Sequence, residues 1–540
     1  MRVPTTLLAL LLSSPAVAQT HAGHGSPEHV VKSPVLGEIN FPTAASKASH
    51  DAFVQGVLLM HNFHYPKAAT AFQNAQRLDP TDVMGYWGEA MTFTHPVWDE
   101  QDTAAAGAVL RRLAPTRETR LAKARTPREK QWLEAAEALY APTGSKAKRD
   151  TAYAAVMATL HETDPNDIEA TTLYALALLG LNQGDRDVAT YQKAYQLVAP
   201  VFAAHPHHPG AAHYLIHATD DPEHAALGLK AAEAYGAIAP SATHAIHMTS
   251  HIFLALGKWD DVVSANVRAQ STIPGGQLSA HIVHWLHYGL VEQGRYREAD
   301  RWLDSMARQA RGWPNPRVAV VRSGLGLMAA ANLADTRRWN GAASRVRVDA
   351  AAFNRITYPE ILEDLAATEF GIALGALYRG DAGVVDATLT QMAAQRAAAA
   401  TDPNSVTSRG MSEVMEKTLR AYVAKKRGDA AGALALFRDA ANQEAALPMP
   451  FGPPQTIKPP REAAGELLLE MGKPVEARDE FIFALKRTPQ RTASLLGLAR
   501  AEWASGRKAE SRKRYRELLT IWHAADADLR ELAEVKVRSR

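Results

Sequence analysis

The stretch SHDAFVQGVLLMHNFHYPKAATAFQNAQRLDP, residues 49–80, decides the fold. Apolar residues recur at helical spacing on both sides of a short corner at residues 62–65, which predicts two helices. Small residues would let these helices cross closely, and a proline would end the second one, because proline cannot continue a helix. The positions concerned are Gly56, Leu59, Ala68, Phe72 and Pro80. The stretch therefore predicts one antiparallel helix pair.

The same skeleton returns near the other end of the chain, and parts of it recur between the two copies. The second copy is Gly465, Leu468, Ala477, Phe481 and Pro489, and the partial copies include Ala433, Phe437, Pro240 and Pro274. This is the skeleton of the tetratricopeptide repeat (TPR). Strand-like alternation is almost absent from Ser49 onward. We expect an all-α, TPR-type helix-pair solenoid, a right-handed superhelix with a concave groove.

The pattern divides the chain into five parts. They are a signal peptide at 1–18, a polar histidine-containing segment at 19–48, an N-terminal TPR array at 49–310, degenerate helical repeats at 311–412, and C-terminal TPR units at 413–540. The last part contains a Pro-rich loop at 448–460 that cannot be helix. We expect this loop to join two helices rather than to fold over a groove.

The first 18 residues have the features of an export signal. Arg2 precedes an apolar stretch at 7–12, and the small residues at 16–18 fit a signal peptidase site. Cleavage after Ala18 would give a periplasmic or secreted protein. Three histidines follow in the polar segment: His21, His24 and His29. This segment is interpreted either as a disordered tail or as a metal-collecting arm.

Composition excludes several classes of function. The 540 residues are 46% hydrophobic and carry a formal charge of +3, so no strong field indicates a nucleic-acid partner. Beyond the leader, no run reaches the roughly 20 apolar residues of a membrane helix, and no membrane span is expected. The chain has no cysteine, so any metal would be held by nitrogen and oxygen. Phosphate-loop, dinucleotide, zincin and Gly-x-Ser-x-Gly motifs are absent, so no nucleotide cofactor is indicated.

Histidines repeat with the period of the helix pairs. His213, His247 and His281 are each 34 residues apart, and so are His217 and His251. A spacing of four residues within a helix puts two side chains on one face. The period therefore predicts a row of histidines along one face of the solenoid.

The chain resembles a family of exported bacterial TPR proteins that carry particular histidine phrases. These are HPGAAHYLIH at 208–217, HMTSHI at 247–252 and, later, FGPP at 451–454. The resemblance implies the fold and export, but it names no settled activity. In similar TPR proteins the first helix of each pair lines the concave surface, which implies that the repeated histidines share one wall of the groove.

We predict a transition-metal site with His213, His217, His247 and His251 as ligands. Neighbouring helices pack roughly 8–10 Å apart, so histidines from adjacent first helices can meet at one ion. Zinc, copper(II) and non-haem iron fit such ligands equally well. Further residues expected at the groove are His244, His281, Asp220, Asp221, Trp285, His61, His95, Glu462 and Glu466. Because ligation needs neutral imidazole, binding is expected to weaken below about pH 6.

The alternative is a TPR scaffold that holds a peptide or partner protein in its groove, with structural histidines. His284 and His287 are expected to be structural groups that hydrogen-bond across neighbouring helices. His208 is expected to be a loop residue. Whether the protein is an enzyme is left open by the sequence, because no catalytic motif is present.

Overall fold

The computed structural model describes residues 36–181, 186–347, 362–449 and 451–540. The predicted leader and the three histidines of the polar segment lie outside these residues. The described chain is all-α apart from one small antiparallel hairpin, β1 (Thr94–His95) with β2 (Glu100–Gln101). None of the described helices is both long and apolar enough to span a bilayer.

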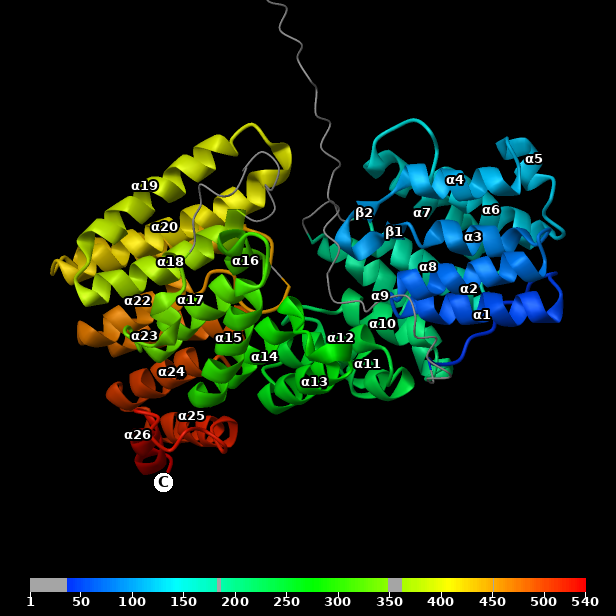
Figure 1. Cartoon of the computed structure of the whole chain (residues 1–540). Coiled ribbons are helices and arrows are strands. Elements are labelled where there is room, and N and C mark those ends of the chain that lie inside the picture. Colours follow the sequence, from blue (N-terminus) through cyan, green and yellow to red (C-terminus); the bar gives the residue numbers. More distant parts are fainter. Residues whose placement is uncertain (1–35, 182–185, 348–361, 450) are drawn as a thin grey trace, which may run out of the picture.

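The helices run in three groups along the chain (Figure 1). The N-terminal group is α1 (Lys47–His61), α2 (Tyr65–Leu78), α3 (Val83–Met91), α4 (Thr103–Leu113), α5 (Arg117–Leu121), α6 (Pro127–Leu139), α7 (Lys146–Thr163) and α8 (Ile168–Leu179). The central group is α9 (Val188–Ala204), α10 (Pro209–Ala218), α11 (Ala225–Ile238), α12 (Thr243–Ala255), α13 (Trp259–Ser271), α14 (Ala280–Glu292) and α15 (Tyr296–Arg311). The C-terminal group is α16 (Pro316–Arg322), α17 (Leu325–Thr336), α18 (Leu362–Arg379), α19 (Ala382–Ala398), α20 (Val406–Lys426), α21 (Ala430–Ala446), α22 (Pro460–Glu470), α23 (Pro474–Arg487), α24 (Thr492–Ala504), α25 (Lys508–Ile521) and α26 (Leu532–Arg538).

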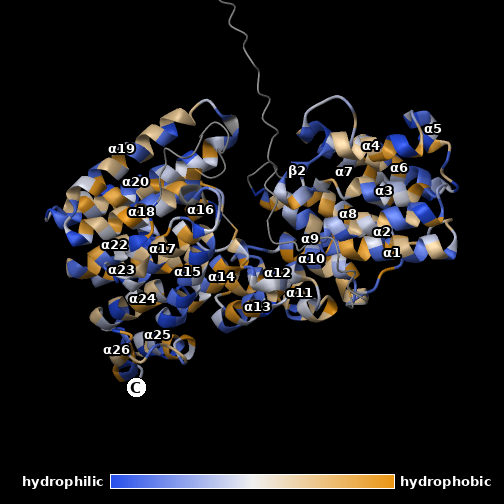
Figure 2. Cartoon of the chain, viewed as in Figure 1, coloured by the Kyte–Doolittle hydropathy of each residue, from blue (hydrophilic) through white to orange (hydrophobic). Residues whose placement is uncertain are grey.

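Successive helices pack as antiparallel pairs, and glycines set the close approach. A Cβ atom on Gly56 of α1 would lie 2.6 Å from the ring of Phe72 in α2, and one on Gly88 of α3 would lie 2.3 Å from it. Gly465 and Gly497 enclose Phe481 in the same way. The packing makes the chain a TPR-type helical solenoid, as the repeated skeleton predicts. Figure 2 shows hydrophobic and hydrophilic residues side by side on most helices, as expected for helices that bury one face.

The solenoid turns tightly enough for its first unit to touch its centre. The end of α1 packs on α10, where a Cβ atom on Gly210 would lie 2.3 Å from Nδ1 of His61. The Tyr235 hydroxyl of α11 donates a hydrogen bond to Oδ1 of Asn62 over 2.9 Å. The corner after α1 is thereby held against α10 and α11, the first central helix pair.

The C-terminal units also fold back onto the central group. The indole N–H of Trp259 donates to the carbonyl oxygen of Gln490 over 3.0 Å, and that of Trp522 donates to the carbonyl oxygen of Glu292 over 2.9 Å. The buried Arg491 guanidinium joins Glu292, Asp335 and Glu462, which come from α14, α17 and α22. Since Arg491 is the N-cap of α24, four separate elements share one ion network.

The Pro-rich loop lies between α21 and α22 and does more than join them. Gly452 has a φ of +85°, and a Cβ atom there would lie 2.5 Å from the Trp285 indole of α14. Phe451 stacks on Tyr191 of α9 with ring centroids 6.3 Å apart. The loop therefore crosses the central helices, contrary to the simple joining role expected from the sequence, because aromatic side chains there offer a surface for it.

Candidate metal centre

Six histidines from three successive first helices meet at the centre of the solenoid. They are His213 and His217 of α10, His244, His247 and His251 of α12, and His281 of α14. Four of the six are buried, His244 is half-buried and His281 is exposed. The predicted row of histidines on these first helices is present. The expectation that it lines an open groove is wrong for the four buried members, because neighbouring segments cover them.

Three of these side chains form a first set, triad A, made of His213, His217 and His244. Nε2 of His213 lies 3.2 Å from Nε2 of His217 and 3.1 Å from Nε2 of His244. Two nitrogens at such distances, each about 2.05 Å from one ion, would subtend an angle of roughly 100°. That angle is close to tetrahedral.

The other three form a second set, triad B, made of His247, His251 and His281. Nε2 of His247 and Nε2 of His251 are 3.3 Å apart, and the rings of His247 and His281 have centroids 4.6 Å apart. In the described residues, no potential metal-binding group combines members of the two triads. The structure thus divides the four predicted ligands into two pairs. Each pair is joined by a third histidine from the next repeat unit.

Hydrogen bonds at the opposite ring nitrogens fix the tautomers of three of these imidazoles. Nδ1–H of His213 donates to the carbonyl oxygen of His61 over 2.7 Å, and Nδ1–H of His251 donates to Asp220 over 2.6 Å. Nδ1–H of His247 donates to Oδ1 of Asn266 over 2.7 Å. The Asn266 amide nitrogen is itself bonded to a backbone carbonyl, so its oxygen faces the histidine. In each neutral ring Nε2 therefore carries a lone pair, as a metal ligand requires.

Aromatic side chains cover both triads. The ring of Phe63 lies 4.3 Å from that of His213 and 5.2 Å from that of His244, centroid to centroid. At triad B, the Trp285 indole covers His251, with ring centroids 4.2 Å apart. Phe63 has a φ of +54°, a left-handed conformation that costs a bulky residue of the order of 1–3 kcal/mol. The corner adopts this strained conformation and thereby places an aromatic ring over triad A.

Burial keeps four of the six imidazoles neutral, those of His213, His217, His244 and His247. It lowers the pKa of His213 and of His247 to about 3, and it lowers the pKa of His217 and of His244 well below the usual value. Neighbouring histidines act in the same direction, because two charged rings so close would repel. The weakening of metal binding below about pH 6 stays a prediction, and the lowered pKa values of these four rings favour proton competition at a lower pH.

A third cluster looks similar but is already satisfied by hydrogen bonds. His61 and His208 donate from Nε2 to the two oxygens of the buried Glu169, over 2.9 and 3.1 Å. Nδ1 of His208 accepts from the backbone N–H of Ala211, and Nδ1 of His61 lies 2.9 Å from the Tyr214 hydroxyl. Burial would raise the pKa of Glu169, but the two imidazoles outweigh it and lower the pKa to about 2. His61 thus supports triad A through its carbonyl, and His208 lies in the loop before α10, as expected, where it is buried and caps that helix.

The other predicted groove residues have different surroundings. The His95 ring stacks on Tyr65, with centroids 4.1 Å apart, and Nδ1 bonds to Glu100. Asp221 pairs with Arg186 over 2.8 Å. Glu462 and Glu466 both accept from the buried Lys458 Nζ, over 2.6 and 2.7 Å, within the C-terminal ion network. Their carboxylates therefore neutralise Lys458 and Arg491, and the described contacts bring neither of them to the histidines.

His284 and His287 pack into the interior, as expected. Burial lowers their pKa values to about 4 and about 3. Within the described residues, however, neither ring nitrogen of His287 has a hydrogen-bond partner. The expected hydrogen bond across helices is therefore wrong for His287.

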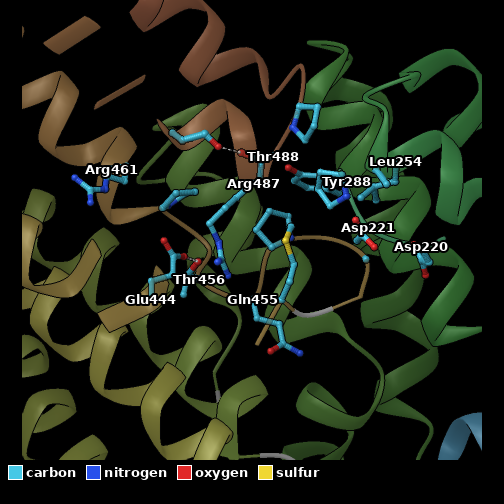
Figure 3. Close-up of a pocket in the computed structure, with 18 of the residues that line it drawn as sticks. Asp220, Asp221, Leu254, Tyr288, Glu444, Gln455, Thr456, Arg461, Arg487 and Thr488 are labelled. Carbon is cyan, nitrogen blue, oxygen red and sulfur yellow. Dashed lines mark hydrogen bonds between the residues drawn. The ribbon is translucent and has the colours of Figure 1, made fainter. Parts of the chain in front are cut away.

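A pocket lies beside triad B, between α12 to α14 and the Pro-rich loop (Figure 3). Figure 3 shows Arg487 reaching into this space, with Glu444 and Thr456 on one side and Asp220 and Asp221 on the other. Since Asp220 accepts from His251, the pocket wall is directly linked to a potential ligand.

Sequence reasoning missed the groups that orient the histidines. Asn266 lies on a second helix, and Glu169 lies far upstream in α8. Phe63 lies in the corner at residues 62–65, for which the sequence predicts no role in the site. No repeat position marks these residues, because each acts through a contact between units that are distant or on different helices.

Comparisons with known proteins add little to this geometry. No protein-family model matches the sequence, and no curated protein is similar to it. Among solved structures, a human IFIT1 dimer with m7Gppp-AAAA is 14% identical, covers 90% of this chain and 92% of its own, and has a TM-score of 0.33. The APC/C hetero-tetramer Cut9-Hcn1 is 12% identical and yeast Tom70 is 11% identical, each covering 91% of this chain and 95% of its own, at TM-scores of 0.30. Such values carry no information on function, and the fold class follows from the helix packing described above.

Proposed function

We propose that this TPR solenoid binds a transition metal through the histidines of α10, α12 and α14, for metal handling or metal-dependent chemistry. Zinc, copper and iron all bind imidazole. The leader-like sequence at 1–18 further suggests that the protein works in the periplasm or outside the cell.

One observation carries the proposal. Nε2 of His247 and Nε2 of His251 face each other at 3.3 Å while both Nδ1–H groups are already engaged. Two neutral rings in this state would oppose lone pairs, and no hydrogen bond can form between them. A proton between them would create a buried imidazolium, which burial opposes at His247. A metal ion bound by both nitrogens resolves the conflict.

The Asp220–His251 pair supports the same conclusion. Ligating histidines usually donate their second N–H to a carboxylate or carbonyl oxygen, which fixes the ring and raises its basicity. His213, His247 and His251 each make such a bond. In the Glu169 cluster, by contrast, every ring nitrogen of His61 and His208 has a protein hydrogen-bond partner, as expected for structural histidines.

The test is a metal count on the untagged protein after chelator treatment and reloading with zinc, copper or iron in turn. We expect wild type to retain metal against a competing chelator and His247→Ala/His251→Ala to lose retention at triad B. His287→Leu is the matched control, because it removes a buried histidine from α14 without touching either triad. Circular dichroism checks that each variant is folded.

Equal metal retention by wild type and by a variant lacking all six triad histidines would contradict the proposal. Absence of binding in wild type would do the same, and would favour the scaffold alternative with structural histidines. Peptide binding unaffected by chelators would then be the next measurement.

A further inference from the structure

We infer that the two triads hold two copper ions side by side, triad A binding one and triad B the other. This inference rests on the proposed metal function and adds the number, the arrangement and the identity of the ions. It differs from the single four-histidine ion that the sequence predicts.

The first argument is the division of the ligand atoms. Each triad brings three ring nitrogens within 4.8 Å of one another, and the described residues contain no group that mixes the two sets. Within triad A the Nε2 separations of 3.1 and 3.2 Å already suit one ion. Within triad B the separation of 3.3 Å suits another. One ion cannot reach both sets at bonding distances of about 2 Å.

The second argument is adjacency. α12 contributes to both triads, with His244 in triad A and His247 and His251 in triad B. The ring centroids of His217 and His251, one from each triad, are 6.2 Å apart. Ring centroids within the triads are 4.8 Å apart for His213 and His217 and 5.1 Å apart for His247 and His251. The ring separation between the sets is thus within the range found inside them, which reaches 6.3 Å for His251 and His281, so two bound ions would be neighbours.

The third argument concerns charge and selects the ion. All six proposed ligands are imidazoles, which are neutral when they bind metal. Two buried carboxylates lie next to the triads: Asp220 bonds to His251 of triad B, and Glu169 bonds to His61, whose carbonyl oxygen accepts from His213 of triad A. Asp221, next to Asp220, is already paired with Arg186. Two monovalent copper(I) ions would be balanced by these two carboxylates, whereas two divalent ions would leave an excess charge of about +2 in a low-dielectric site.

Three imidazoles per ion leave further coordination positions open. Sites with three protein ligands and one open position are those that bind exogenous ligands or substrates. His244 is half-buried and His281 exposed, so each triad also has one ligand through which an ion can enter. Both proposed copper ions would therefore be accessible from solvent, each through its own triad.

The experiment loads the metal-free protein with copper(I) under anaerobic conditions, removes weakly bound metal with a copper(I) chelator, and counts copper. A portion is then oxidised to copper(II) for electron paramagnetic resonance. We expect two copper ions per chain in wild type and a signal reduced or broadened by coupling between neighbouring spins. His244→Ala and His281→Ala are expected to retain one copper each and to show an isolated copper(II) spectrum of one spin per chain.

These two substitutions remove the least buried member of each triad, so the fold should tolerate them. His287→Leu should keep two copper ions and the coupled signal. One copper in wild type, lost in both variants, would overturn the two-ion inference and leave the proposed metal function standing. Two uncoupled copper(II) ions would overturn the adjacency. Copper retention in none of the proteins, together with no retention of zinc or iron, would remove the proposed function as well.

Discussion

Asp220 accepts a 2.6 Å hydrogen bond from Nδ1 of His251, and the same carboxylate residue lines the pocket beneath the Pro-rich loop. The bond holds the His251 ring with Nε2 directed at His247. A group bound in the pocket would therefore be one residue away from a proposed metal ligand.

Removing this carboxylate should weaken metal binding at triad B alone. For Asp220→Ala we expect a loss of about 10- to 100-fold in affinity, the usual effect of losing a partner that orients a ligand. Competition titration with a chelator measures it. Asp221→Ala is the control, since that carboxylate bonds to Arg186 and His224 instead. Equal losses in the two variants would mean that the neighbouring charge, and not the His251 bond, matters.

Metal binding should be resistant to acid. The prediction concerns triad A, where burial lowers the pKa of His213 to about 3 and the pKa values of His217 and His244 well below the usual value, so protons do not compete for these nitrogens between pH 7.5 and about pH 5. We expect the retained metal to be constant over that interval and to fall nearer pH 4. Dialysis across the pH series followed by elemental analysis checks it. A midpoint near 6.5, the ordinary histidine value, would show that the ligands are solvated in the metal-free protein.

His287→Leu should stabilise the protein, and more so in acid. Its ring is fully buried with unpaired nitrogens among the described residues, a state that costs about 1–3 kcal/mol. Its pKa is about 3 in the fold and near 6.5 when unfolded, so the unfolded chain binds more protons as pH falls below 6.5. The native state consequently loses about 2 kcal/mol at pH 5 through this residue.

Urea unfolding of the metal-free protein at pH 7.5 and pH 5.0 measures both effects. We expect the variant to have the higher free energy of unfolding at both values and the smaller drop between them. A variant less stable than wild type at pH 7.5 would indicate that the imidazole makes a favourable interaction that leucine cannot replace.

The packing of the Pro-rich loop can be tested at one glycine. In Gly452→Ala the new Cβ atom would lie 2.5 Å from the buried Trp285 indole, and φ is +85°. In Gly472→Ala φ is +72°, but the space around the Cβ atom is open. Both variants carry the left-handed strain of about 1 kcal/mol, and only the first has the clash. We expect Gly452→Ala to be less stable by a further 1–3 kcal/mol, with changed tryptophan fluorescence.

Equal stabilities of the two variants would show that the loop moves off Trp285 without cost. Trp285 contacts the rings of both His247 and His251, so the same variant also tests whether the loop influences triad B.

The sequence predicts the fold class because close helix packing leaves a local mark. Gly56 and Phe72 meet inside one unit, and the same spacing recurs wherever the packing recurs. The histidine pairs are predictable for the same reason, since the repeat places His213 and His247 at equivalent positions of successive units. The third member of each triad is harder to assign, because His244 and His281 occupy different positions in their units.

The groups that orient the triad histidines cannot be predicted from the repeat pattern. The carbonyl of His61 reaches His213 across 152 residues, because the superhelix closes on itself. The curvature that does this depends on every intervening pair of helices. Glu462 is expected at the groove, but the C-terminal units fold back and its carboxylate neutralises Arg491. This contact, too, depends on the curvature of the superhelix.

The closure of α1 on α10 also limits how the protein can be shortened. A fragment containing only α10 to α15 would include all six triad histidines, yet it would lack the His61 carbonyl and the Phe63 ring that position and cover triad A. It would equally lack Gly452 and Arg491, which contact Trp285 and Glu292 of α14. The smallest fragment that keeps the proposed metal site and its supports is therefore nearly the whole solenoid.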